Sequence, residues 1–264
     1  MTSSSEPASL RQLKPERHYR IWGSTRLEPW FSNTSEKIGE VWFPDPDSPL
    51  LVKFLFATEN LSVQVHPDDA LAQQKGHPRG KTEMWHILRT EPGAKIALGF
   101  NAPVTSHQVR EAALDASIMG LLRWIPVHPG ETWFIPAGAV HAIGAGVTVC
   151  EVQQNSDITY RLFDYGRGRE LHLEDSLLAA NLSYQPGKPS IEAGLQVDCP
   201  YFQVNRIDVA GESTGNPASL VIALSGSGKI GSEPFEQGQV FSVSGSAPLP
   251  LNGNAQVLTV STRI

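Results

Sequence analysis

The sequence contains very little cysteine, and this scarcity excludes two kinds of architecture. Cys150 and Cys199 are its only cysteines, and they lie far apart in the chain. A disulfide framework and a thiolate zinc site both need closely grouped cysteines, so we expect neither. The composition is typical of a reducing compartment, and it predicts a cytoplasmic protein.

A basic excess and a long apolar run are also missing. The chain has 21 Lys and Arg against 27 Asp and Glu, which gives a net charge of −6. Without a basic stripe, nucleic-acid binding is not expected. No apolar run approaches the roughly 20 residues that cross a bilayer, so no membrane partner is expected. Residues 1–9 are polar and rich in serine, which predicts a frayed start over residues 1–10 and no signal peptide.

What the chain does contain is short alternating apolar segments separated by 23 glycines and 20 prolines. This pattern predicts a mainly all-β barrel or sandwich with a few short helices. We expect strands near 50–58, 61–66, 82–89, 95–99, 131–135, 147–153, 159–163, 201–209, 219–225, 239–243 and 256–261. Start signals predict one helix beginning at residues 67–69, a second over 105–119 and a third over 173–181.

The segment 184–190 is the best candidate for a linker, because it combines two prolines with glycine and serine. It divides the chain into residues 1–190 and a glycine- and serine-rich β segment, 191–264. In that segment the run that starts at Gly238 echoes the run that starts at Gly130, but it lacks the later proline and histidine. A second metal-free unit and an ordinary β-hairpin both fit this echo.

One motif is specific. Gly130, Pro136, Gly138 and His141 have the spacing G-x5-P-x-G-x2-H, which resembles the second sequence motif of the cupin barrels. Residues 132–135 form a short aromatic and β-branched strand, the proline and glycine turn it, and the histidine opens the next strand. An imidazole that points into a small barrel is a ready metal ligand.

Further ligand candidates lie on two upstream strands. Alternation in residues 61–66 places Ser62, Gln64 and His66 on one face. In residues 81–88 it places Lys81, Glu83 and Trp85 on one face. Each strand alone could be a half-exposed edge, but together with the motif they suggest a lined cavity. His66, Glu83 and His141 supply two imidazoles and one carboxylate, a common ligand set for a catalytic metal, and Gln64 could add a carbonyl oxygen.

The remaining histidines have simpler interpretations. His86 falls on the strand face opposite Glu83, so the Glu-x-x-His spacing there is interpreted as coincidental. Four others are interpreted as surface or packing residues: His77, His107, His128 and His172.

Longer runs resemble the type I mannose-6-phosphate isomerases in their short bacterial form. The matching runs are residues 49–69, 81–88, 131–146 and 151–167. The resemblance implies a cupin β-jelly-roll barrel followed by a smaller, degenerate, metal-free cupin-like unit. It also implies one zinc ion per chain, held by Gln64, His66, Glu83 and His141. The implied activity interconverts mannose 6-phosphate and fructose 6-phosphate through a cis-enediol. Where the family usually has Trp-Gly-Gly, this chain has Trp-Gly-Ser at residues 22–24.

The resemblance further implies functional roles outside the ligand set. Arg161 would be a catalytic arginine that stabilises the enediolate, although an ion pair with Asp157 or Asp164 is the simpler alternative. Lys81 would line the active site, where it holds a substrate oxygen or moves a proton; a solvated strand-end lysine is the alternative. Ser62, Lys81 and Arg167 are the expected phosphate contacts, with Arg169 near Arg167.

Two other functions remain open on sequence grounds. Two histidines and a carboxylate on a cupin also suit ferrous iron, as in a metal-dependent oxygenase. A non-catalytic sugar-phosphate-binding cupin is the third possibility. The residues determine neither the proton-abstracting base nor the oligomeric state, and they leave open the metal used and the discrimination among phosphosugars.

Overall fold

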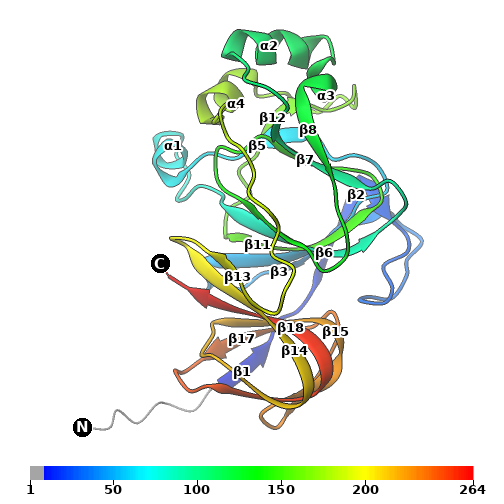
Figure 1. Ribbon diagram of the computed structural model, residues 1–264, viewed down its shortest axis with the longest axis vertical. Coiled ribbons are helices and arrows are strands. Elements are labelled where there is room, and N and C mark those ends of the chain that lie inside the picture. Colours follow the sequence, from blue (N-terminus) through cyan, green and yellow to red (C-terminus); the bar gives the residue numbers. More distant parts are fainter. Residues whose placement is uncertain (1–8, 264) are drawn as a thin grey trace.

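The computed structural model describes residues 9–263, and antiparallel β-sheet dominates it as predicted (Figure 1). The six-stranded sheet has the order β2 (Glu16–Ser24), β3 (Ile38–Phe43), β4 (Leu50–Phe56), β11 (Val147–Gln154), β6 (Glu83–Thr90), β9 (Thr132–Ile135). The five-stranded sheet has the order β12 (Tyr160–Phe163), β5 (Val63–Val65), β10 (His141–Ile143), β7 (Lys95–Phe100), β8 (Leu122–Pro126).

The seven-stranded sheet gathers the C-terminal strands and one N-terminal strand. Its order is β1 (Ser9–Gln12), β17 (Val240–Ser244), β15 (Leu220–Ile230), β18 (Leu249–Thr262), β14 (Phe202–Gly215), β13 (Gly194–Asp198), and β16 (Glu233–Glu236) pairs with β15. The helices are α1 (Asp69–Gln74), α2 (Ser106–Leu114), α3 (Ile118–Leu121) and α4 (Leu173–Ala179). No helix among residues 9–263 is long and apolar enough to cross a membrane.

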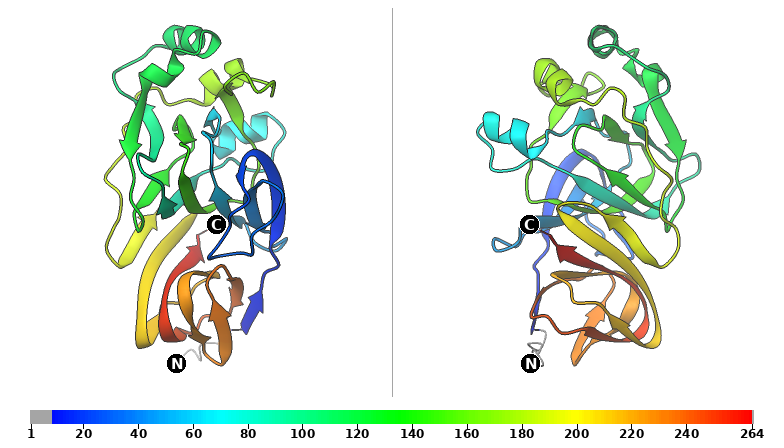
Figure 2. Two further views of the ribbon diagram at one scale, coloured as in Figure 1. Left: turned by 90° about the vertical axis from the view of Figure 1, so that its right-hand side faces the viewer. Right: turned by 60° about the vertical axis from the view of Figure 1, so that its left-hand side comes forward.

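The six-stranded sheet is the middle layer of the molecule. The five-stranded sheet and the helices lie above it in Figure 1, the seven-stranded sheet lies below, and Figure 2 shows the same order from two other sides. Phe54, Met84 and Cys150 of the middle sheet share one apolar core with Val204 and Leu258 of the seven-stranded sheet. Since side chains alternate along a strand, the neighbours of these residues point the other way, towards the five-stranded sheet.

The helix start signals were interpreted correctly, but α2 and α4 end earlier than predicted, at Leu114 and Ala179. Asp68 accepts a hydrogen bond from the backbone of Leu71 at the start of α1, and Thr105 forms a capping box with Gln108 at the start of α2. A single helix over 105–119 is wrong, because Ala116 adopts a left-handed backbone with φ of 67° between α2 and α3.

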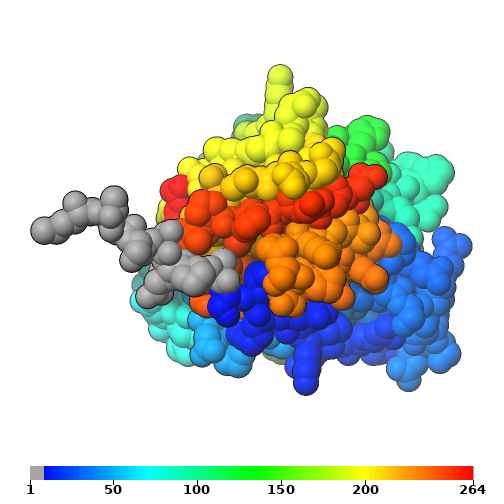
Figure 3. All heavy atoms as spheres, turned by 90° about the horizontal axis from the view of Figure 1, so that it is seen from below, coloured from blue at the N-terminus to red at the C-terminus, as the bar shows by residue number. Residues whose placement is uncertain are grey.

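The expectation of a frayed start is wrong for residues 9 and 10, and residues 1–8 lie outside the described chain. Ser9 and Leu10 belong to β1, which pairs with β17 along Ser9–Ser244 and Leu10–Val243. Figure 3 shows this N-terminal segment, in dark blue, packed against the C-terminal strands. The described part of the chain therefore begins in the seven-stranded sheet, and β2 and β3 also precede the first predicted strand.

The predicted echo between the two glycine runs is present in the backbone. Gly130 and Gly238 have φ of +92° and +84°, and β9 and β17 each begin two residues later. A Cβ at Gly238 would lie 2.4 Å from the carbonyl oxygen of Trp30, so glycine is needed there for space as well. The two segments thus share a local turn into a strand.

Candidate metal centre and active site

Three side chains converge between the five- and six-stranded sheets. His66, Glu83 and His141 are at most 1% exposed, and one ligand atom from each lies within 4.8 Å of the others. Each histidine Nε2 is 3.5 Å from a Glu83 carboxylate oxygen. The structure therefore brings together His66 and Glu83, which sequence alternation had placed on inward faces, and His141, which the motif had identified.

Strand register explains why remote residues meet here. On the five-stranded sheet, Gln64 of β5 pairs with His141 of β10 on one side and with Arg161 of β12 on the other. On the facing six-stranded sheet, Glu151 of β11 pairs with Lys53 of β4 and with Trp85 of β6. Directly opposed residues on one face of a sheet lie about 5 Å apart, so each sheet presents a continuous row of functional side chains.

Hydrogen bonds orient both imidazoles towards the centre. Nδ1 of His66 lies 2.9 Å from the carbonyl oxygen of Ile158, and Nδ1 of His141 lies 2.9 Å from that of Ala139. A carbonyl oxygen can only accept, so each Nδ1 carries the proton and each Nε2 presents a lone pair. Burial and the nearby Lys81 ammonium lower the pKa of His66, and burial lowers the pKa of His141 to about 4. Both rings are therefore neutral, as metal ligation requires.

The turn of the G-x5-P-x-G-x2-H motif forms a hydrogen bond with the backbone of His66. Gly138 has φ of +85°, which glycine adopts without a steric penalty, and its N–H donates to the carbonyl oxygen of His66 at 2.8 Å. This bond joins the turn after β9 to the end of β5. The G-x5-P-x-G-x2-H spacing thus places His141 and also supports His66.

Gln64 lies beside the cluster with its amide within reach. Its Nε2 is 3.2 Å from Nε2 of His141, and its Oε1 accepts a hydrogen bond from Ser62 at 3.1 Å. A hydroxyl can donate or accept, so half a turn of the amide would direct the carbonyl oxygen at the cluster and keep the bond to Ser62. Gln64 can therefore serve as a fourth, neutral ligand.

The contacts of the Glu83 carboxylate indicate whether the cluster can hold a cation. Among residues 9–263, neither carboxylate oxygen has a partner with hydrogen-bond geometry, although Lys81 Nζ lies 2.6 Å from Oε2. The Lys81 ammonium compensates the Glu83 charge, but the carboxylate oxygens also face the unprotonated Nε2 atoms of His66 and His141 at 3.5 Å. Two imidazole lone pairs and a carboxylate that face one another without a proton between them fit a divalent metal ion.

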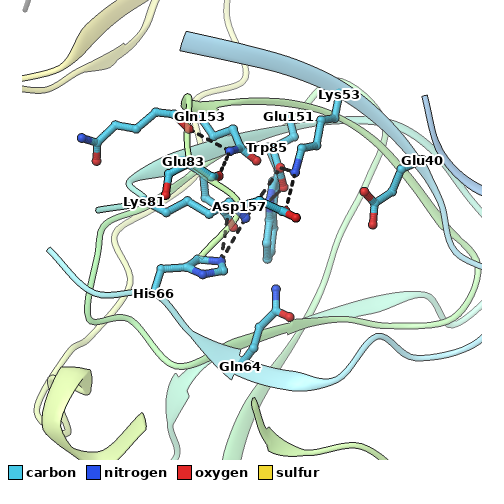
Figure 4. A network of polar contacts seen from close by, with 12 residues as sticks. Glu40, Lys53, Gln64, His66, Lys81, Glu83, Trp85, Glu151, Gln153 and Asp157 are labelled. Carbon is cyan, nitrogen blue, oxygen red and sulfur yellow. Dashed lines mark hydrogen bonds and ion pairs between the residues drawn. The ribbon is translucent and has the colours of Figure 1, made fainter. Parts of the chain in front are cut away.

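A charged group beside the cluster adds chemistry that the sequence did not reveal. Glu151 is 3% exposed and lies 3.9 Å from both Lys53 and Lys81, and the indole of Trp85 donates to it at 2.9 Å (Figure 4). Burial and the nearby Glu83 raise the pKa of Glu151. Burial alone would lower the pKa of Lys81, but the Glu151 and Glu83 carboxylates outweigh it and raise that pKa. Lys81 is therefore an ammonium ion, whereas burial and Glu83 favour the protonated form of Glu151.

These groups line a pocket of about 310 Å³ between the two sheets. Its lining comprises Arg20, Trp22, Glu40, Lys53, Leu55, Leu61, Ser62, Gln64, Lys81, Trp85, Ile143, Glu151, Asp157, Thr159, Arg161 and Arg169. Figure 4 shows Gln64 and His66 facing Lys53, Glu83 and Glu151 across it. The pocket is therefore lined by both rows of side chains.

Most of the predicted site residues meet here, and one does not. Lys81 and Ser62 are buried in the pocket and not at solvated strand ends. Arg167 lies outside the pocket lining within the described chain: its guanidinium contacts Glu59 at 3.0 Å and the carbonyl oxygen of Asn60 at 2.8 Å. Its neighbour Arg169 lines the pocket instead.

The alternative role for Arg161 is not supported. Asp157 lies 3.7 Å from Lys53, and Asp164 pairs with Arg169. Among residues 9–263 no ion pair to the Arg161 guanidinium is formed, and its Nε is buried without a partner. The guanidinium is therefore available to the pocket.

Other predictions are also resolved by the structure. His86 faces away from the pocket as expected, and its Nδ1 lies 2.9 Å from Oγ1 of Thr132. Ser24, which replaces the second family glycine, is not among the positive-φ residues of the described chain, so serine is unstrained there. Lys53 and Glu151 were missed, although each is the one charged residue in an apolar strand segment, LLVKFLF and VTVCEV.

Comparison with known proteins agrees with this arrangement. No protein-family model matches the chain. The chain is 32% identical over 275 residues to mannose-6-phosphate isomerase of Streptococcus mutans, a match that covers 83% of this chain and 85% of the relative. It is 35% identical over 284 residues to mannose-6-phosphate isomerase ManA of Bacillus subtilis, with 86% and 90% covered.

Solved structures share the same fold. The mannose 6-phosphate isomerase from Bacillus subtilis has a TM-score of 0.81 at 26% identity, covering 94% of this chain and 98% of that one. A mannosephosphate isomerase from Archaeoglobus fulgidus, described as putative, has a TM-score of 0.80 at 18% identity, covering 98% and 99%. The chain thus shares its fold with solved isomerases. The identity to curated relatives over most of the chain shows that it belongs to the mannose-6-phosphate isomerase family.

Proposed function

We propose that this enzyme interconverts mannose 6-phosphate and fructose 6-phosphate, with one zinc ion per chain and a cis-enediol(ate) on the reaction path. The observation that carries the proposal is the buried His66–Glu83–His141 cluster, which lies beside a pocket lined by Gln64, Lys81 and the unpaired Arg161. Family membership favours an isomerase over the oxygenase and the non-catalytic binding protein.

The proposed ligands are Gln64, His66, Glu83 and His141, a set of two nitrogens and two oxygens that suits zinc. When bound, the cation supplies a positive charge that polarises a carbonyl or hydroxyl oxygen of the sugar. Because Glu83 is the one anionic ligand, the net local charge stays positive towards an anionic substrate.

Arg161 is proposed to stabilise the negative charge that develops on a sugar oxygen when a carbon loses its proton. Its guanidinium stays charged and offers a planar fork of donors. Among the described residues no carboxylate forms an ion pair with this guanidinium, so its N–H donors remain available to a substrate oxygen.

Glu151 is proposed to move the proton between the two adjacent sugar carbons. Its raised pKa lets it take and return a proton, and Lys53, Lys81 and Trp85 hold its carboxylate in the pocket. Lys81 then acts as a hydrogen-bond donor to a substrate oxygen and not as the base, because its pKa is raised.

The phosphate is proposed to contact Ser62, Lys81 and an arginine of the 167–169 segment. Ser62 and Lys81 already line the pocket. Arg169 lines it as well, whereas Arg167 would have to leave Glu59 to reach a substrate. Arginine is favoured because its fork of N–H groups matches phosphate oxygens.

For the fold, we propose a catalytic cupin domain over residues 1–190 and a metal-free cupin-like unit over 191–264. Strand β1 is the exception, because it adds to the sheet of the second unit. The shared glycine turn before β9 and β17 supports the relationship between the two units.

The decisive experiment is a coupled assay of mannose 6-phosphate conversion with the purified protein. We expect turnover that a chelator abolishes and that stoichiometric Zn²⁺ restores, with metal content measured on the same samples. Full turnover by protein shown to contain no metal would contradict the proposal, and so would the absence of turnover in the zinc-loaded protein.

The role of Arg161 has a separate test. Arg161→Ala should keep the bound metal and lower kcat by about 100-fold or more, the loss expected when a donor to a developing oxyanion is removed. Arg123→Ala, an exposed arginine on β8, serves as the matched control. Normal turnover by the Arg161 variant would exclude a catalytic role for this residue.

A further inference from the structure

The Arg161 side chain is not fastened by its own contacts. Among residues 9–263, no hydrogen bond or ion pair holds the guanidinium, and its buried Nε has no partner. The backbone sets the point and the direction at which a side chain leaves a strand. Whatever holds the Arg161 backbone therefore limits the positions that its guanidinium can reach in the pocket.

The backbone of Arg161 lies in an edge strand of the sheet. Strand β12 is at the edge of the five-stranded sheet, next to β5 alone. Its pairing with β5 shifts register between Arg161 and Phe163, a β-bulge-like irregularity that re-aims a side chain. The outer N–H and C=O of Arg161 have no neighbouring strand, so the ladder fixes this residue from one side only.

His172 lies on the outer side of β12, where no neighbouring strand pairs with Arg161. The backbone N–H of Arg161 donates to Nδ1 of His172 at 3.2 Å, and the backbone N–H of His172 donates to the carbonyl oxygen of Arg161 at 2.8 Å. One residue thus binds both outer backbone groups of Arg161. An unprotonated Nδ1 is an acceptor, so the imidazole itself, and not only the backbone, closes this contact.

His172 is in turn held by helix α4, which it precedes. Ser176 N–H donates to the carbonyl oxygen of His172 at 2.7 Å. Ion pairs tie the first turn of α4 to the other helices, Asp175 to Lys75 near the end of α1 and Glu174 to Arg110 of α2. The His172 imidazole therefore precedes a helix, α4, that ion pairs hold against α1 and α2.

We propose that His172 is a positioning residue that fixes the Arg161 guanidinium in the pocket by accepting the Arg161 backbone N–H at Nδ1. The proposal rests on the proposed function, in which Arg161 acts on the substrate. It assigns a role to a histidine that sequence analysis had interpreted as a surface or packing residue.

The test compares two substitutions that differ in where they place an acceptor. His172→Asn keeps an oxygen near the position of Nδ1, whereas His172→Gln moves it towards the position of Nε2. We expect kcat for mannose 6-phosphate to fall about 10- to 100-fold in His172→Gln with KM changed less than about threefold, because the reacting group is misplaced. His172→Asn should stay within about threefold of the unmodified enzyme, since the hydrogen bond is kept.

Two controls separate positioning from general damage. His107→Gln makes the same change on the exposed face of α2 and should leave kcat unchanged. In an Arg161→Ala background, His172→Gln should produce no further loss, because the group that it positions is gone. Equal losses in His172→Asn and His172→Gln, or an undiminished effect in the Arg161→Ala background, would overturn the inference. An inactive unmodified enzyme would instead overturn the proposed function.

Discussion

The two faces of the six-stranded sheet carry opposite chemistry although they belong to the same strands. In β4, Lys53 faces the pocket while Phe54 next to it faces the seven-stranded sheet. In β11, Glu151 and Cys150 divide in the same way. One face of the sheet therefore lines a charged pocket, and the other face packs in an apolar core.

A lone charged residue in a strand that is covered on both sides indicates a functional site. Such strands are almost continuously apolar, since neither face meets water. A single Lys or Glu in that setting cannot be a solvated residue, because burying a charge is costly unless it has partners. Lys53 and Glu151 are 3% exposed, and each supplies a partner to the other.

The largest expected effect is on the apolar face. Phe54→Ala should lower the free energy of unfolding by about 3–5 kcal/mol, because Phe54 is fully buried between the two sheets. Urea unfolding measures this change, and kcat per folded molecule should remain near the unmodified value. A tenfold loss of kcat in fully folded protein would show that the two faces are not separable.

The second effect is the pH dependence of the free energy of unfolding, which His86 on the same face of the sheet contributes. Burial and the nearby Arg206 guanidinium lower the pKa of His86 to about 4, below the roughly 6.5 of an unfolded chain. Its stabilising contribution is therefore complete above pH 6.5 and declines as the pH falls towards 4. Between pH 7.5 and pH 5.0 the unmodified protein should lose about 2 kcal/mol relative to His86→Leu, as urea unfolding at both pH values measures. Parallel losses in the two proteins would mean that His86 does not titrate in this way.

The smallest expected effect is on the pocket face, beside Phe54. Lys53→Met keeps the shape of the side chain but removes a cation 3.9 Å from Glu151, so we expect kcat to fall about tenfold. The free energy of unfolding should change less than in Phe54→Ala, because Glu151 keeps the Lys81 ammonium and the Trp85 indole as partners when Lys53 is replaced. Lys95→Met, an exposed lysine on β7, is the control, and equal kcat in both variants would remove Lys53 from the active site.

Much of the site was predictable because its signals are local. Alternation placed Gln64 with His66 and Glu83 with Lys81, and the motif spacing identified His141. Two residues have partners that the sequence does not indicate, for a tertiary reason. Arg167 contacts Glu59 and the backbone of Asn60, which precede β5, and nothing near it in sequence indicates that partner. The interpretation of His172 as a surface or packing residue overlooked its bond to Arg161, which exists only once α4 lies beside β12.

The fold shows the same division. The helix caps and most strands were correctly interpreted, because their causes lie within a few residues, whereas β8, β13 and β16 were not predicted. The pairing of β1 with β17 was not foreseen, since it joins the two ends of the chain. The break at Ala116 was missed as well, because helix-forming residues on both sides favour continuation.

By itself the sequence determined which side chains share a face within each strand, and hence the chemical type of the site. That follows from the covalent geometry of a strand, in which alternate side chains point the same way. The tertiary structure alone decided which strands lie side by side and in which register. His141, Gln64 and Arg161 form one row, and Lys53, Glu151 and Trp85 form the facing one, because hydrogen-bonded ladders between distant segments and a common core select one register among many.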